Sequence, residues 1–164
     1  MRVGLGYDIH RTQSGSSIVL GGVTFDAPFS LVGHSDADAL LHAITDAILG
    51  ALADYDIGYY FPPSKEENKK RASSDFLFFA VERMRTRGYA IENIDCNVIC
   101  EVPKIQPVRE KIRQNLAKLL SVDIERVSVK GRTKEKVDAV GRGEALECQA
   151  VVLLSAKAGD NAVE

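Results

Sequence analysis

The sequence lacks the cysteine pattern of a disulfide-stabilised or zinc-ribbon protein, and it lacks any long apolar run. Its three cysteines, Cys96, Cys100 and Cys148, are an odd number without C-x-x-C spacing, which argues against a disulfide framework and a thiolate zinc site. No stretch reaches the roughly 18 apolar residues of a membrane span, and the chain opens on strand-like sequence rather than a signal segment. We therefore expect a cytoplasmic protein with no membrane association, although a trimmed organellar protein would look the same.

The chain also has little net charge and no familiar nucleotide-binding loop. Neither G-x-x-x-x-G-K-[ST] nor G-x-G-x-x-G occurs, and a net charge of -2 is too balanced to predict a nucleic-acid partner. The balance hides an asymmetry, because residues 1–60 carry seven Asp, no Glu and two Arg, a net charge of -5, whereas the remainder carries +3. His10, His34 and His42, which are all of the histidines, lie in the acidic part. This clustering is the first indication of chemistry.

The length and composition predict one soluble α+β domain. With 164 residues, 45% of them hydrophobic and 27% charged, the chain can bury roughly 68–70% of its unfolded surface and needs no metal for folding alone. We expect a single domain over residues 1–157 and a disordered tail over 158–164. Hydrophobic periodicity and turn residues predict strands at 1–10, 91–102, 127–130 and 145–155, a hairpin at 17–25, helices at 36–53, 74–86 and 105–120, and a loop at 54–71.

The predicted strands at 91–102 and 145–155 each have one apolar face and one mixed face. In the last strand Leu146, Cys148, Ala150, Val152 and Leu154 alternate with Ala145, Glu147, Gln149, Val151 and Leu153. The apolar faces are expected to pack on the helices. The mixed faces either meet solvent or line an interface in a symmetric oligomer.

The first strand and the first helix carry a candidate metal site. Asp8 and His10 share one strand face with Gly4 and Gly6, opposite Val3, Leu5, Tyr7 and Ile9, so the Asp8 and His10 side chains leave the same side of the sheet. His42 can supply a third ligand, and three ligands leave an open position, as in catalytic zinc sites. The alternative is that the D-x-H pattern binds no metal and marks a strand that ends in a solvated turn. Asp38 and Asp46 share the helix stripe of His42; each can be a ligand, a helix cap, or a group that orients His42.

Two further segments have the chemistry of phosphate sites. His34 and Ser35 precede the predicted helix, of which Ser35 is the expected N-cap, and a helix N-terminus favours an anion; the alternative is a plain cap beside an exposed histidine. The second segment is the basic stretch 130–136, with 141–143 beyond it, where Glu135 either holds a magnesium ion or neutralises lysines. Together these features indicate a metal-dependent enzyme that acts on a phosphorylated small molecule.

Several short motifs, in order, resemble the 2-C-methyl-D-erythritol 2,4-cyclodiphosphate synthase family over about residues 1–155. They are R-V-G-L-G-Y-D-I-H at 2–10, G-G-V at 21–23, H-S-D-A-D at 34–38, H-A-I-T-D at 42–46, D-I-G at 56–58, F-P at 61–62, P-K at 103–104, T-x-E-K at 133–136 and G-R-G-E at 141–144. The resemblance implies a two-layer α+β sandwich whose mixed sheet has helices on one face, assembled as a homotrimer with the sheets around a threefold axis and active sites between adjacent subunits.

The reaction implied by the resemblance is a cyclising, CMP-releasing phosphorus-oxygen lyase step of the non-mevalonate isoprenoid pathway. The 2-phosphate of 4-diphosphocytidyl-2-C-methyl-D-erythritol 2-phosphate attacks its own β-phosphorus. Asp8, His10 and His42 would bind zinc, Glu135 would bind Mg²⁺ or Mn²⁺, and His34 and Thr133 would stabilise the transferring phosphate. The remaining substrate contacts that the resemblance implies are Ser35, Asp56, Ile57, Gly58, Phe61, Cys100, Pro103, Lys104, Ile105, Gln106, Gly131 and Arg132. Arg142 and Glu144 would lie near an axial cavity that can take up an isoprenoid diphosphate.

The sequence departs from the family at Pro63, Arg132 and Ala139, where Asp, a small residue and an aromatic residue are more usual. These positions affect the loop at 61–65, the rim of the nucleotide pocket and the axial cavity rather than the metal site. The same residues are compatible with two other functions. A metal-dependent phosphohydrolase would release free phosphate or a linear diphosphate, and a binding module would sense isoprenoid diphosphates through Arg142 without turnover.

Overall fold

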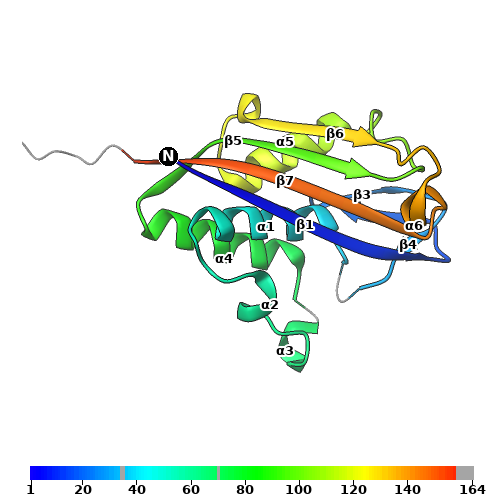
Figure 1. Cartoon of the computed structure of the whole chain (residues 1–164), viewed down its shortest axis with the longest axis horizontal. Helices are drawn as coiled ribbons and strands as arrows, with labels where there is room; N and C mark the ends of the chain where they lie inside the picture. The colour runs from blue at the N-terminus through cyan, green and yellow to red at the C-terminus, as the bar shows by residue number, and fades with distance from the viewer. Residues whose placement is uncertain (34–35, 70, 158–164) are drawn as a thin grey trace, which may run out of the picture.

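A computed structural model describes residues 1–33, 36–69 and 71–157. The chain forms two layers, a mixed β-sheet and a set of helices on one of its faces (Figure 1), which confirms the α+β prediction. The strands are β1 (Arg2–Gln13), β2 (Ser17–Leu20), β3 (Val23–Asp26), β4 (Ser30–Leu31), β5 (Tyr89–Ile99), β6 (Val127–Arg132) and β7 (Ala145–Ala156). The helices are α1 (Ala39–Ala51), α2 (Ile57–Tyr60), α3 (Glu66–Lys69), α4 (Ser73–Thr86), α5 (Arg109–Leu120) and α6 (Asp138–Gly141), with a 3₁₀ turn at Ile124–Arg126.

The main sheet has the strand order β4-β1-β7-β5-β6, so β1 lies near one edge and β6 forms the other. β7 pairs antiparallel with both β1 and β5, whereas β5 and β6 are parallel and are joined through α5. β2 and β3 form a separate hairpin. The order separates the first strand from the basic segment around β6 by two strands.

The apolar face predicted for β7 is confirmed, and β5 likewise buries Ile94, Cys96 and Val98, whereas Val102 on the same predicted face lies beyond β5 and is 45% exposed. Leu146, Cys148, Ala150, Val152 and Leu154 are fully buried on the side of the helices. The alternate residues of β7 lie on the open side, where Val151 is exposed. The three cysteines are free and buried.

β1 packs on α1 through its glycines rather than through its large apolar residues. A Cβ atom built on Gly6 would lie 1.8 Å from the carbonyl oxygen of Ala43, and one on Gly4 would lie 1.8 Å from that of Ala47. Only glycine therefore allows the helix backbone to approach the strand this closely. The close approach places the N-terminal half of α1 directly over Asp8 and His10.

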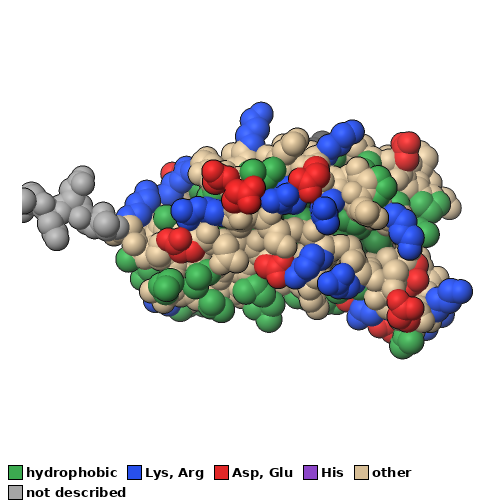
Figure 2. Space-filling view, turned by 90° about the horizontal axis from the view of Figure 1, so that it is seen from above, with side chains coloured by type: hydrophobic (Ala, Val, Ile, Leu, Met, Phe, Trp, Pro, Cys, Tyr) green, Lys and Arg blue, Asp and Glu red, His purple; other side chains and the backbone are tan. Residues whose placement is uncertain are grey.

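The opposite face of β1 is apolar and exposed. Val3 and Leu5 are 66% and 69% exposed, and Tyr7 and Ile9 beside them are also exposed. Leu5 pairs with Val151 of β7, so the apolar strip extends across two strands. Figure 2 shows basic and acidic side chains interspersed with hydrophobic ones, without a large area of a single charge. An apolar strip of this kind on a sheet is typical of a surface that another protein covers.

Several predicted element boundaries are wrong. The strand predicted at 1–10 continues to Gln13, and the strand predicted at 91–102 spans Tyr89–Ile99. The helix predicted at 36–53 begins only at Ala39, because Ala37 has a φ of 50°, outside the helical region, and its N-cap is Asp38 rather than Ser35, which lies outside the described residues. The predicted loop at 54–71 contains the short helices α2 and α3. The helix predicted from 105 begins at Arg109, since Pro107 disfavours helical geometry at the residue before it.

Candidate active site

Three side chains from two elements converge on one point in the manner of metal ligands. Asp8 and His10 point from β1 toward His42 on α1, with His10 Nε2 and His42 Nδ1 each 2.9 Å from Asp8 Oδ2. The two ring nitrogens are 3.4 Å apart, and the three side chains are partly buried. Among the described residues, no other group of three or more His, Cys, Asp or Glu side chains brings its ligand atoms close enough together to hold one metal ion. The structure thus brings the predicted zinc ligands together.

The donor set fits a divalent cation. His10 Nδ1 lies 2.7 Å from the carbonyl oxygen of Val32, which can only accept a hydrogen bond, so this nitrogen carries the proton and Nε2 presents its lone pair to the cluster. Although burial opposes the charge on Asp8, the imidazoles of His10 and His42 beside it hold the pKa of its carboxyl well below the usual range. The pKa of His10 is raised against the effect of burial, by Asp8 and by Val32. A lone pair and a carboxylate at this distance repel each other unless a proton or a cation lies between them, and zinc accepts this ligand set.

Asp38 and Asp46, the two alternative ligands, serve other purposes. Asp38 is fully buried, and its carboxylate accepts backbone hydrogen bonds from Gly21, Gly22 and Leu41 at 2.6–3.0 Å. Burial raises its pKa to about 6 against the effect of these bonds. Asp46 Oδ1 accepts the N–H of Ile57 at 2.8 Å. Asp38 therefore caps α1 and ties it to the β2–β3 turn, while Asp46 anchors the start of α2.

The α2 segment carries predicted substrate contacts and lies beside the metal cluster. Asp56 caps α2 by accepting the N–H of Tyr59 at 2.9 Å, and its neighbours Ile57 and Gly58 form the first turn. The ring of Phe61 packs on Phe76 at 4.7 Å between centroids, and Phe76 lies 5.8 Å from the ring of His42. One aromatic ring therefore separates Phe61 from a predicted metal ligand.

A salt-bridge network fixes the same segment to α4. Asp54 accepts hydrogen bonds from Arg83 at 2.6 and 2.8 Å, from Arg87 at 2.7 Å and from the hydroxyl of Tyr60. Burial raises the pKa of Asp54, but the bonds from Tyr60 and Arg83 prevail and lower it to about 2. The carboxylate is thus held charged and nearly inaccessible, and it joins the residues on either side of Asp56 to the helix layer.

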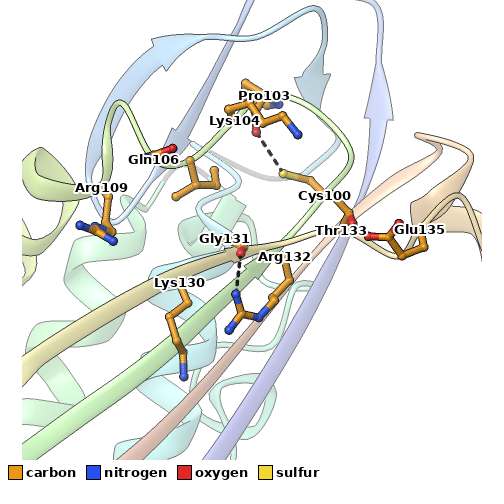
Figure 3. A pocket seen from close by; sticks show the side chains of 11 residues that line it. Cys100, Pro103, Lys104, Gln106, Arg109, Lys130, Gly131, Arg132, Thr133 and Glu135 are labelled. Atoms are coloured by element: carbon orange, nitrogen blue, oxygen red, sulfur yellow. Dashed lines mark hydrogen bonds between the residues drawn. The ribbon is translucent and has the colours of Figure 1, made fainter.

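A cavity of about 530 Å³ lies between the loop after β5 and the end of β6 (Figure 3), within the usual size range of small-molecule sites. It includes every residue that the resemblance implies for these two segments: Cys100, Pro103, Lys104, Ile105, Gln106, Gly131, Arg132, Thr133 and Glu135. Gly131 allows the loop to approach β6, since a Cβ there would lie 2.9 Å from Cβ of Ile105. Burial raises the pKa of the Cys100 thiol to about 11, so this wall of the cavity is neutral.

Four of the five charged residues that line the cavity are cations. Lys104, Arg109, Lys130 and Arg132 contribute positive charge, whereas Glu135 is the only acidic residue of the lining. Lys130 forms an ion pair with Asp95, and Arg109 pairs with Glu110 at 3.3 Å. Arg109 was not predicted, because it begins a helix outside the basic segment and only the folded chain brings it to the rim. The charge distribution suits an anionic ligand such as a phosphate ester.

Glu101 holds the segment that carries Thr133 and Glu135. Its Oε1 accepts the N–H of Lys134 at 2.9 Å and that of Lys136 at 3.3 Å. Glu135 and Lys136 both have positive φ angles, 50° and 63°, which few residues other than glycine adopt. The hydroxyl of Thr133 donates to Glu135 Oε1 at 2.5 Å. A carboxylate from the loop after β5 therefore stabilises a strained turn at the other side of the cavity.

The remaining predicted residues are not all gathered in one place. The lining of the cavity contains none of Asp8, His10 and His42. Arg142 forms a bidentate ion pair with Glu144, at 2.7 and 3.2 Å, outside both sites. His34 and Ser35 lie outside the described residues. Within one chain, the metal cluster and the cationic cavity are thus separate.

Comparisons with known proteins agree on one family. The model of the YgbB family matches residues 1–155. A 2-C-methyl-D-erythritol 2,4-cyclodiphosphate synthase from Marinobacter nauticus is 48% identical over 95% of this chain and 98% of its own length. A bifunctional enzyme IspD/IspF from Caulobacter vibrioides is 49% identical over 96% of this chain, which corresponds to 41% of that protein. A solved structure described as IspF from Plasmodium falciparum in a CDP complex superposes with a TM-score of 0.85 and 39% identity, over 96% of this chain and 97% of the other.

Proposed function

Because the chain belongs to the YgbB family, whose full-length relatives are named as cyclodiphosphate synthases, we propose that it converts 4-diphosphocytidyl-2-C-methyl-D-erythritol 2-phosphate to 2-C-methyl-D-erythritol 2,4-cyclodiphosphate and CMP. The observation that carries the proposal is the convergence of Asp8, His10 and His42 in a chain of this family. A CDP complex of a structure 39% identical to this chain supports a cytidine nucleotide as part of the ligand. The cytoplasmic location expected from composition stays a prediction.

The reaction is an intramolecular phosphoryl transfer, in which the protein chiefly has to position two anionic groups. The nucleophile is already an anionic phosphate, so no general base is required. Its attack on the β-phosphorus forms the new P–O–P bond as the bond to CMP breaks, and CMP leaves as an anion. What remains of the activation barrier is the entropy lost, and the charge repulsion overcome, when the two phosphate groups are brought together in the geometry for in-line attack.

The side chains divide this work between the two sites. Asp8, His10 and His42 would hold zinc, and Glu135 would hold Mg²⁺ or Mn²⁺; the two ions would supply Lewis-acid charge to the phosphates. Thr133 lies next to Glu135 and can donate to a phosphate oxygen, as His34 is also expected to do. Lys104 and the neutral wall at Cys100 would receive the cytidine end, while Ser35, with the α2 segment at Asp56, Ile57 and Gly58, would hold the methylerythritol end.

A trimer would bring the two sites together. The apolar strip of β1 and β7 is unusually exposed for a surface in contact with water, and the metal cluster and the cavity lie toward opposite edges of the sheet. Sedimentation should give about three times the 17.9 kDa chain mass; a mass near that of one chain at micromolar concentration would contradict the trimer. Uptake of an isoprenoid diphosphate beside Arg142 also stays a prediction, and such a ligand would have to compete with Glu144.

The activity is tested by incubating the purified protein with the cytidyl substrate, zinc and magnesium and measuring CMP together with the cyclic product. We expect both in equal amounts, and no product after a chelator has removed the metals. Free phosphate or a linear diphosphate instead would show a phosphohydrolase. His42→Ala should abolish turnover, and a cooperative unfolding transition in urea should show that the variant still folds. Unchanged turnover would show that the metal assignment is wrong.

A further inference from the structure

We propose that Ser73 and Asp36 are positioning residues for the metal site, because together they fix the tautomer and the orientation of His42. The inference deepens the proposed function and rests on its metal site. Neither residue was predicted to act on the cluster from the sequence. Ser73 is the first residue of α4, which packs beside α1, and its side chain is buried between the two helices with 1% of the residue exposed.

The contacts form a chain that runs outward from the cluster. His42 turns Nδ1 toward Asp8 and His10, and its other ring nitrogen, Nε2, lies 2.8 Å from Ser73 Oγ. Ser73 Oγ is also within hydrogen-bond distance of Asp36 Oδ1, and the backbone N–H of Ser73 donates to the same carboxylate at 3.2–3.3 Å. The order is therefore cluster, His42, Ser73, Asp36.

The number of protons determines the direction of each bond. A serine hydroxyl has one proton, and the Asp36 carboxylate can only accept, so Ser73 donates to Asp36. The hydroxyl oxygen is then an acceptor for His42, which must carry its proton on Nε2. His42 Nδ1 consequently presents a lone pair to the cluster, as a neutral imidazole ligand must.

The two histidines are thus fixed by different means. His10 donates to a backbone carbonyl, that of Val32, which no side-chain substitution removes. His42 depends on the hydroxyl of one side chain and, through it, on a carboxylate that increases the electron density of the ring. Asp36 also receives the N–H at the start of α4, where Ala72 provides no side-chain cap, so the same carboxylate holds Ser73 in place.

The test measures zinc affinity directly, by competition with a chromophoric chelator, on variants of the full chain. Ser73→Ala leaves the Nε2 proton of His42 without its acceptor, and we expect affinity to fall 10- to 100-fold. Ser73→Thr restores the hydroxyl and should recover most of the affinity. Ser74→Ala is the matched control, with the same change one residue further along α4, and should stay within twofold of wild type. Asp36→Asn should weaken binding less than Ser73→Ala, since the amide oxygen still accepts from Ser73 but carries no charge.

A second measurement separates positioning from general support of the fold. The visible spectrum of the Co²⁺-substituted protein reports ligand geometry, and we expect it to change in Ser73→Ala but not in Ser74→Ala. Zinc affinity of Ser73→Ala within twofold of wild type would overturn the inference and leave the proposed function intact. Wild-type protein that binds no zinc would instead overturn the metal site itself. If Ser73→Ala does not fold, Asp36→Asn decides, and zinc affinity equal to that of wild type would then count against the inference.

Discussion

The close contact between β1 and α1 predicts that Gly6→Ala damages stability and metal binding together. The new Cβ would lie 1.8 Å from the carbonyl oxygen of Ala43, whereas ordinary contact begins at 3.4 Å, so the helix has to move by about 1.6 Å. The obstacle is helix backbone rather than the end of a flexible side chain. We therefore expect a loss of about 3 kcal/mol, at the upper end of what overpacking costs. At 2–4 °C for each kcal/mol, the melting temperature should fall by about 6–12 °C.

The same displacement carries His42, the residue before Ala43, away from Asp8 and His10. Zinc sites tolerate deviations of about 0.2 Å in ligand distance, so a shift several times larger should weaken zinc binding by more than 100-fold. Urea denaturation at fixed protein concentration and chelator competition measure the two effects.

Gly50→Ala on α1 is the matched control for this prediction. Its Cβ would meet nothing closer than 3.8 Å, at the carbonyl oxygen of Leu5. The gain in helix propensity should therefore stabilise the protein by about 0.5–1 kcal/mol, and zinc affinity should not change. If Gly6→Ala unfolds at the wild-type urea midpoint, α1 does not depend on the glycine face of β1 and the reasoning is refuted.

Three further predictions concern carboxylates away from the metal. Glu101→Ala should raise the dissociation constant of CDP about tenfold, or about 1.4 kcal/mol, because the turn at 134–136 loses its acceptor; calorimetry should show a smaller effect for Glu101→Gln. The pKa of Asp38 is about 6 in the folded chain against about 4 in the unfolded chain. The folded form therefore stays protonated up to a higher pH, and the free energy of unfolding should fall as pH rises from 4 to 6. Asp38→Asn should flatten that slope in urea midpoints, and an unchanged slope would contradict the assignment. The pKa of Asp54 is lowered to about 2, so its contribution is present above pH 4 and lost as pH falls toward 2. Asp54→Asn should remove this acid-side loss, and equal acid sensitivity in both proteins would show that the network does not matter.

Local geometry predicted only part of the metal cluster. D-x-H on a strand places both side chains on one face, whereas His42 shares its helical stripe with Asp38 and Asp46, and the resemblance to the family singled it out. Ser73 could not be found in the same way, since its contact with His42 depends on how α4 packs against α1. Asp38 and Asp46 show the limit of spacing arguments. Both lie on the correct stripe, but backbone N–H groups from other elements claim their carboxylates.

The alternation of residue types predicted a strand at residues 1–10 but did not decide which face of that strand is buried. The usual rule buries the large apolar residues, yet here the face with Gly4 and Gly6 lies against α1 while Val3 and Leu5 face outward. Two glycines two residues apart on one face were the signal for a helix in close contact. The exposed apolar face was the signal for a further partner, and hydrophobicity alone does not distinguish a second copy of the chain from a helix of the same chain.

Strand order connects this exposed face to the chemistry. The metal cluster is attached to β1, next to one edge of the sheet, and the cationic cavity is attached to β6 at the opposite edge. In a cyclic assembly that uses the open face of each sheet, opposite edges of neighbouring copies lie side by side. The acidic N-terminal third of one chain, with its metal ligands, would then meet the basic segment of the next, so that the diphosphate and the 2-phosphate of one substrate could contact both. In that assembly, the charge asymmetry along the chain would correspond to the separation of two half-sites, and the apolar strip of β1 would be the surface on which the copies meet.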